Sequence, residues 1–185
     1  IPSVEFIEFN SHEEINKIDQ YTSCVVLETI QGSAGFIKPK EDYLNKVKKR
    51  CDKVGALLIL DEIQTGIGRT GKLFGFQNFN CEPDVIVFGK GLGGGMPIGA
   101  FTTSKKKMDV LHNDPILGHI TTFGANPVIC ASALETLKIV LNTKIMSSIV
   151  EKEKLTRNLL IHKHISEIRG MGLMLSIILK DSSLA

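Results

Sequence analysis

The sequence predicts an α/β fold in which a mixed, mainly parallel sheet is packed against helices. Three short apolar runs, residues 23–28, 56–61 and 84–89, have the length and composition of strands. Continuous apolar runs of this kind are typical of parallel strands that are buried on both faces. A helical pattern lies between the first two runs, and alternating strands and helices are characteristic of the α/β class.

The first helix is expected to start near Pro39, which would stand in its first turn, and to end at Gly55 in the C-cap position. Its apolar residues recur at helical spacing, at Tyr43, Leu44, Val47, Cys51 and Val54.

A fourth strand is predicted at residues 98–102. The link that precedes it is too short for a parallel crossover, so we expect this strand to be antiparallel. A helix then follows over residues 127–141, with Asn126 as its N-cap and Pro127 at its first position.

The last part of the chain predicts a second unit. A helix over about residues 145–161 should bury one apolar face, and residues 165–172 resemble a strand entering another sheet. The residues of that helical face are Ile145, Ile149, Leu155 and Leu159. We therefore expect residues 1–142 to belong to a large domain, and residues 143–185 to form a linking helix and the start of a small C-terminal domain. The sequence is expected to be a fragment of a longer protein.

The composition fits a globular protein without a nucleic-acid or membrane partner. Hydrophobic residues make up 43% and charged residues 23% of the chain, and the net charge is +2. No apolar run reaches the ~18 residues of a membrane span. Four cysteines lie far apart, without a C-x-x-C pair, and we expect them to be buried free thiols in a reducing, cytoplasmic compartment. We expect no metal site.

Polar residues follow three of the apolar runs directly. Glu28 ends the first, Asp61 and Gln64 follow the second, and Lys90 follows the third. In open α/β sheets, ligands bind at the carboxyl ends of the strands, so these side chains could converge on one crevice. Considered one at a time, each has an ordinary interpretation, as a solvated lysine, a turn-capping aspartate or a loop glutamine.

Together these residues suit a pyridoxal-phosphate (PLP) site. Such a cofactor needs a lysine for its aldehyde and an acid for its pyridine nitrogen, which Lys90 and Asp61 could provide. Glycines on both sides of Lys90 would let the backbone pass close to a planar ligand. The glycine run at 91–95 matches neither a G-x-G-x-x-G dinucleotide motif nor a P-loop.

Five stretches, in order along the chain, resemble motifs of the class III aminotransferases, the family of ornithine, acetylornithine and 4-aminobutyrate aminotransferases. The central one is LDEIQTGIGRTG at residues 60–71, and the segment at 83–99 resembles the surroundings of the family's PLP lysine. The other three are residues 28–32, 121–127 and 168–174. The resemblance implies a fold-type-I PLP-dependent transferase.

The resemblance also implies a role for individual residues. Lys90 matches the lysine that holds PLP as a Schiff base and shuttles a proton, and Asp61 matches the partner of the pyridine nitrogen. Gln64 matches the donor to the phenolic oxygen, and Ile63 the apolar residue on one ring face. Thr122 matches a threonine that reaches the PLP phosphate of the neighbouring subunit, which implies a homodimer with a shared site. Glu28 is a further candidate cofactor-binding residue.

The implied reaction is the transfer of an amino group from an amino-acid or ω-amino donor to a 2-oxo acid, through an internal aldimine on Lys90. Another class III reaction (an aminomutase, racemase or decarboxylase) and a non-catalytic fragment are the alternatives. Two positions depart from the family: Thr29 stands where proline is usual, and Ser33 stands where many members have a glutamate that influences substrate choice.

Overall fold

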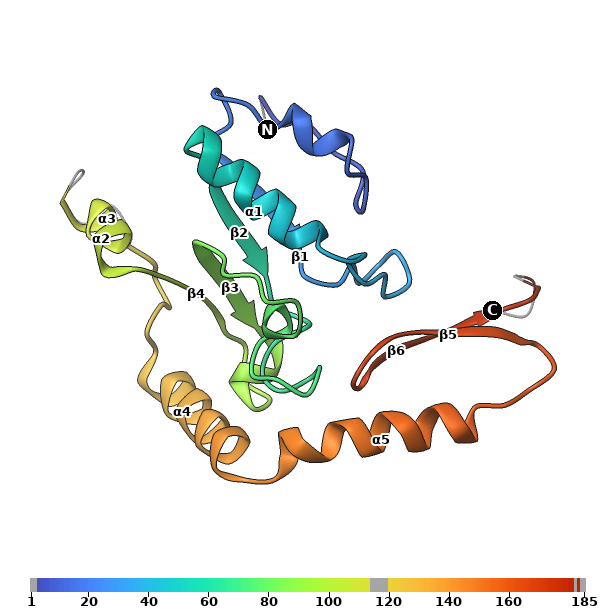
Figure 1. The fold of residues 1–185 in the computed structure, drawn as a ribbon. Helices are drawn as coiled ribbons and strands as arrows, with labels where there is room; N and C mark the ends of the chain where they lie inside the picture. Colours follow the sequence, from blue (N-terminus) through green and yellow to red (C-terminus); the bar gives the residue numbers. More distant parts are fainter. Residues whose placement is uncertain (1–2, 114–119, 182, 184–185) are drawn as a thin grey trace.

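The structure is a computed structural model that describes residues 3–113, 120–181 and 183, and these residues form two separate sheets (Figure 1). The larger sheet contains four strands, in the order β1 (Cys24–Glu28), β2 (Leu57–Asp61), β3 (Val85–Gly89) and β4 (Gly99–Thr103). The smaller sheet is a hairpin of β5 (Ile165–Met171) and β6 (Met174–Leu179). The predicted α/β class is confirmed.

The directions of the strands agree with the sequence analysis. Strands β1, β2 and β3 are parallel, and β4 is antiparallel to β3. Glu28 lies opposite Asp61, and Asp61 lies opposite Val87, so the carboxyl ends of the three parallel strands meet at one edge. The sheet is therefore mixed and mainly parallel.

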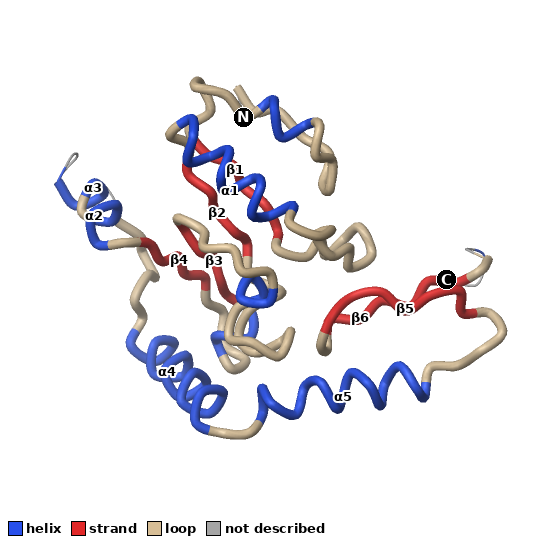
Figure 2. Tube along the Cα trace, in the orientation of Figure 1, coloured by secondary structure: helices blue, strands red, loops and turns tan. Residues whose placement is uncertain are grey.

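The helices connect and flank these sheets (Figure 2). Within the described ranges, three short 3₁₀ turns, named η1 to η3, accompany five α-helices. The α-helices are α1 (Tyr43–Val54), α2 (Lys105–Met108), α3 (Val110–Asn113), α4 (Pro127–Asn142) and α5 (Ile145–Leu159). The 3₁₀ turns are η1 (Glu14–Lys17), η2 (Gly75–Asn78) and η3 (Lys90–Gly93).

Helix α1 begins later than predicted. Its N-cap is Asp42, so Pro39 lies outside the helix and not in its first turn. The backbone before the helix is occupied by other contacts: the Lys40 amide donates to the side chain of Asn10 at 2.7 Å. The predicted end is confirmed, because Gly55 adopts a left-handed conformation with φ of 82° and caps the helix.

The core lies between α1 and one face of the larger sheet. Leu58 and Leu60 of β2 are fully buried, whereas Leu57 and Ile59 are only half-buried. The expectation that this strand is buried on both faces was therefore wrong for the chain as described. Successive side chains of a strand point to opposite faces, and α1 covers only the face of the even-numbered residues.

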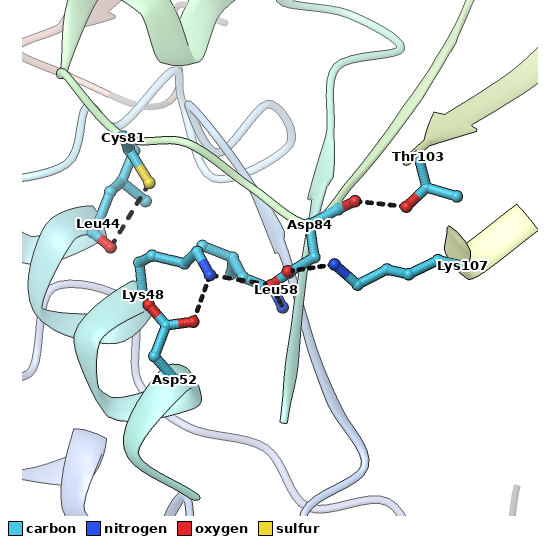
Figure 3. Close-up of polar contacts among 8 residues, drawn as sticks. All are labelled: Leu44, Lys48, Asp52, Leu58, Cys81, Asp84, Thr103 and Lys107. Carbon is cyan, nitrogen blue, oxygen red and sulfur yellow. Dashed lines mark hydrogen bonds and ion pairs between the residues drawn. The ribbon is translucent and has the colours of Figure 1, made fainter. Parts of the chain in front are cut away.

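Asp84, directly before β3, joins four elements in and around the larger sheet (Figure 3). Its carboxylate accepts a hydrogen bond from the Leu58 amide at 2.9 Å and forms ion pairs with Lys48 of α1 and Lys107 of α2, at 3.2 and 2.9 Å. The Thr103 hydroxyl of β4 donates to the Asp84 carbonyl at 2.7 Å.

These contacts determine how Asp84 titrates. Burial would raise the pKa of its carboxyl, but the Leu58 amide and the ammonium groups of Lys107 and Lys48 outweigh that effect and lower the pKa. The ionised form of Asp84 is therefore part of the folded structure.

Helices α4 and α5 lead from the larger sheet to the hairpin (Figure 1). The predicted N-cap is confirmed, because the Asn126 side chain accepts hydrogen bonds from the Val128 and Ile129 amides at 3.0 and 3.3 Å. The expected domain division after residue 142 coincides with the end of α4, and the division itself stays a prediction.

The apolar face predicted for α5 is largely uncovered. Ile149 is buried beside Gly71, but Leu155 and Leu159 are 58% and 72% exposed, and Ile145 is also exposed. The periodicity identified the helix correctly. The expectation of a buried face was wrong because the described residues cover this apolar face only at Ile149, while the later turns of α5 contact the hairpin through the polar side chains of Glu153 and Arg157.

The cysteines also differ from expectation. All four are free thiols, but only Cys51 and Cys81 are buried, while Cys24 and Cys130 are exposed. Across the described ranges, no helix is long and apolar enough to cross a membrane.

Candidate active site

The candidate site lies at the edge where the parallel strands end. Glu28 and Asp61 are neighbours in the register of β1 and β2, and the amide that follows Asp61 donates to the Val87 carbonyl of β3 at 2.7 Å. Lys90 comes directly after β3. The structure thus brings the predicted strand-end residues to a common edge.

Lys90 begins the turn η3 and has an unusual backbone conformation, with φ of 39°. The preceding position, Gly89, has no room for a side chain, because a Cβ there would lie 2.8 Å from the Ile98 carbonyl oxygen. Helix α4 holds the far end of the turn, where the Ser132 hydroxyl donates to the Gly93 carbonyl at 2.7 Å. The loop that carries the lysine is therefore fixed on both sides.

A cavity of about 280 Å³ opens in front of this turn. Three of the predicted site residues, Lys90, Ile63 and Gln64, line it together. The other lining residues come from the same two segments and from two more, and they are Gly66, Ile67, Arg69, Gly91, Phe36, Leu173 and Met174.

The remaining predicted residues lie outside this lining. Asp61 accepts a hydrogen bond from the Ile63 amide at 2.8 Å, so it borders the segment that enters the cavity. Glu28 accepts from the Gly32 amide at 2.8 Å. Thr122 is exposed in the segment before α4. Their assigned roles stay predictions.

Gly32 brings two of the candidate residues together. A Cβ at this position would lie 2.6 Å from Gln64 Oε1 and 3.1 Å from Glu28 Oε2. Any other residue would have to displace at least one of these side chains. The glycine therefore permits Glu28 and Gln64 to approach the same turn.

The sequence analysis assigned no role to Glu62, which is fully buried directly behind the site. Its carboxylate accepts hydrogen bonds from the Thr29 and Thr65 hydroxyls, both at 2.5 Å, and from the Gly75 and Phe76 amides, at 2.7 and 2.8 Å. One signal was available: Glu62 continues the even-numbered row of Leu58 and Leu60, which points into the core.

The sequence analysis also missed the wall contributed by the hairpin. Glu153 of α5 pairs with Arg157 at 2.8 Å and accepts from the Gly172 amide at 2.6 Å. Arg157 in turn donates to the carbonyls of Ile168 and Gly170 at 2.6 and 3.1 Å. This arrangement, which we call the Glu153–Arg157 clamp, holds the turn between β5 and β6 so that Leu173 and Met174 reach the cavity.

Comparison with known proteins agrees with this geometry. The sequence model of the aminotransferase class-III family matches residues 5–184. This chain belongs to the class III aminotransferase family. The family and its fold confirm the resemblance inferred from the five motifs.

Solved structures of ornithine aminotransferases are similar to the chain. The enzyme from Toxoplasma gondii has 33% sequence identity and a TM-score of 0.90 over 99% of this chain and 44% of that one. The enzyme from Plasmodium falciparum has 34% identity and a TM-score of 0.86 over 97% of this chain and 48% of that one. The chain therefore spans slightly less than half the length of these enzymes.

A family member with a different named substrate is also similar. Taurine:2-oxoglutarate aminotransferase from Bifidobacterium kashiwanohense has 32% identity and a TM-score of 0.77 over 84% of this chain and 36% of that one. Its fold is thus shared by aminotransferases that act on different amino donors.

The cofactor of this family is pyridoxal phosphate, which the Toxoplasma gondii structure contains at partial occupancy. The cavity suits it: Lys90 offers a primary amine, Gln64 an amide donor and Ile63 an apolar surface. Gly91, which has no side chain, also lines the cavity. Among the described residues, no group of three or more potential metal ligands occurs.

Proposed function

We propose that the chain is the central part of a PLP-dependent aminotransferase of the ornithine or acetylornithine type, which transfers an amino group from an amino-acid or ω-amino donor to a 2-oxo acid. The supporting observation is that Lys90, Ile63 and Gln64 line one cavity beside the strand end that bears Asp61. The named relatives are aminotransferases, which favours amino transfer over a mutase, racemase or decarboxylase reaction.

When bound, pyridoxal phosphate supplies an aldehyde that captures amines and a ring that accepts electrons. Lys90 would anchor it covalently through Nζ and, once released by the substrate amine, would take the proton from the substrate α-carbon. The Asp61 carboxylate would hold a proton on the pyridine nitrogen. Gln64 would donate to the phenolic oxygen, and Ile63 would pack on one face of the ring.

We further propose that the enzyme is a homodimer in which Thr122 reaches the phosphate bound by the neighbouring subunit. The segment around Thr122 and the adjoining helix α4 expose large apolar side chains to solvent. They include Ile120, Phe123, Val128, Leu134 and Ile139. Extensive exposed apolar surface marks sites that are covered by other polypeptide, which supports this proposal. The four free thiols support a reducing, cytoplasmic location.

The selection of the amino donor would not use an acidic switch residue at position 33. Ser33 is exposed and uncharged, so it cannot form the ion pair that a glutamate forms at this position in ornithine-type members. The substrate preference of ornithine aminotransferase is therefore not carried over to this chain.

One experiment tests this function. The chain is produced alone and together with the N-terminal half of the Toxoplasma gondii enzyme, and PLP absorbance, size and transamination are measured. The donors are ornithine, acetylornithine, 4-aminobutyrate and taurine, with 2-oxoglutarate as acceptor. We expect the chain alone to associate, to bind PLP weakly and to lack transamination, and we expect the combination to bind PLP and transaminate.

Two results would count against the proposal. If the chain alone were a monomer that binds PLP tightly and transaminates, its dependence on further polypeptide would be wrong. If PLP were bound and the products were those of racemisation or decarboxylation, amino transfer would be wrong.

A further inference from the structure

The most completely bonded side chain near the site is the carboxylate of Glu62, which is 0% exposed. Each of its oxygens accepts one hydroxyl and one backbone amide: Oε1 accepts from Thr29 and Phe76, and Oε2 accepts from Thr65 and Gly75. A carboxylate has about four acceptor positions, so this set of donors is complete.

No ion pair of Glu62 with a basic side chain occurs in the described part of the chain. A buried carboxylate without a cation depends on its hydrogen bonds, and the loss of one donor leaves an acceptor that water cannot reach. Each of the four donors is therefore important for the position of Glu62.

The position of Glu62 in turn fixes the start of the cavity wall. Its amide donates to the Val87 carbonyl at 2.7 Å, and its carbonyl accepts from the Gly66 amide at 2.9 Å. Ile63 and Gln64 lie between these two anchor points. Since both line the cavity, a shift of Glu62 would move the two side chains that face it.

Thr29 differs from the other three donors because it comes from a different strand end. Thr65, Gly75 and Phe76 all belong to the segment between Glu62 and the end of η2, whereas Thr29 follows β1 and is also 0% exposed. Its hydroxyl is the side-chain donor that links the end of β1 to this carboxylate. Proline, which is usual at this position of the family, has no hydroxyl to donate.

We propose that Thr29 is a positioning residue of the PLP site: its hydroxyl fixes the Glu62 carboxylate and thereby holds Ile63 and Gln64 in place against the cofactor ring. The second half of this inference, the placement of Ile63 and Gln64 against the cofactor, rests on the proposed function. Its first half, the link between Thr29 and Glu62, concerns the chain alone.

The first half is tested by hydrogen exchange of the Gly75 and Phe76 amides in the full chain. Thr29→Val keeps the shape and removes the hydroxyl, so these amides should exchange about tenfold faster, as expected when a hydrogen bond to a charged group is lost. Thr29→Ser should restore slow exchange. Thr102→Val, the same change at an exposed strand position, should leave both amides unchanged. Equal exchange in Thr29→Val and the unchanged protein would overturn the link.

The second half is tested by the absorption band of bound PLP in the PLP-loaded protein. With Gln64 displaced, the phenolic oxygen loses a donor and holds more negative charge, so the pH midpoint of the band should rise in Thr29→Val and return in Thr29→Ser. A midpoint that stays constant while the amides exchange faster would show a structural role only and overturn the positioning role. If the unchanged chain, combined with the N-terminal half of the Toxoplasma gondii enzyme, gives no PLP band, the proposed function fails and the positioning role with it, while hydrogen exchange still decides the link.

Discussion

Leu173 and Arg69 are joined by a backbone hydrogen bond, in which the Leu173 amide donates to the Arg69 carbonyl at 3.0 Å. Through this contact the turn of the hairpin is attached to the loop that lines the cavity. Residues more than a hundred positions apart thus build one wall, and the Glu153–Arg157 clamp also holds the turn.

A methyl group at Gly172 should break this attachment. Gly172 has φ of 61°, and a Cβ would lie 2.5 Å from the Arg69 carbonyl oxygen. Gly55 has a similar φ of 82° with no atom within 4 Å of its Cβ position, so Gly55→Ala is the matched control for backbone strain alone. Strain of this kind costs about 1–2 kcal/mol. We expect Gly172→Ala to lower the thermal midpoint more than Gly55→Ala.

Hydrogen exchange of the Leu173 amide separates the clash with the Arg69 carbonyl from backbone strain alone. This amide should exchange faster in Gly172→Ala and stay protected in Gly55→Ala, because only the first change pushes the turn away from Arg69. Equal protection of Leu173 in both variants would contradict the attachment.

The acid stability of the protein should depend on Asp84. The folded pKa of this carboxyl lies below its ordinary value of 3.8. Its contribution to the free energy of unfolding is therefore fully present above about pH 4 and is lost as the pH falls through the folded pKa. Asp84→Asn should therefore destabilise the protein by about 1–3 kcal/mol at pH 7, and the difference should shrink in acid.

The control for this prediction is Asp42→Asn, which breaks an exposed pair with Lys46 at 3.1 Å. An exposed pair contributes at most about 1 kcal/mol. Thermal midpoints at matched protein concentration between pH 7 and pH 3 provide the measurement. A difference between Asp84→Asn and the unchanged protein that is constant over this range would show that the charge of Asp84 is unimportant.

The four thiols should react in two classes. Burial raises the pKa of Cys51 and of Cys81 to about 11, so only about one thiol in a thousand is ionised at pH 8. Cys24 and Cys130 are exposed. Alkylation by iodoacetamide, followed by mass spectrometry, should modify the exposed pair first, and all four should react in denaturant. Native reaction of Cys51 as fast as that of Cys24 would contradict the burial described for the core.

Much of the sheet could be predicted because its signals are local. The apolar runs identified the three parallel strands, and the short link after Lys90 indicated the antiparallel fourth strand. The strand-end rule also placed Lys90 and Gln64 at the same edge. These features depend on residues that are close together in the sequence, so they can be predicted from the sequence alone.

The remaining features depend on which elements pack together. The apolar pattern of β2 does not reveal that α1 covers only the face of Leu58 and Leu60. The sequence of the hairpin likewise does not reveal that Leu173 lines the cavity, because that position depends on the contact between Glu153 of α5 and the Gly172 amide. Long-range packing of this kind has no periodic signature along the chain.

Asp61→Asn separates binding from turnover. The amide keeps the shape of the side chain but loses the charge that would hold the pyridine nitrogen protonated. In the chain combined with the N-terminal half of the Toxoplasma gondii enzyme we expect PLP still to bind and kcat to fall about 10²- to 10⁴-fold, which corresponds to ~3–5 kcal/mol. Asp52→Asn, a change on the exposed side of α1, is the control. A near-normal kcat for Asp61→Asn would exclude the proposed role.

The most direct test of the account is the identity of the lysine that holds the cofactor. Borohydride should reduce the link between PLP and Nζ of the lysine, and peptide mapping of the reduced protein should find the cofactor on Lys90. Lys90→Arg, which keeps the charge, should abolish the label. Recovery of the reduced cofactor on Lys72, or on any lysine other than Lys90, would contradict the assignment of the active site.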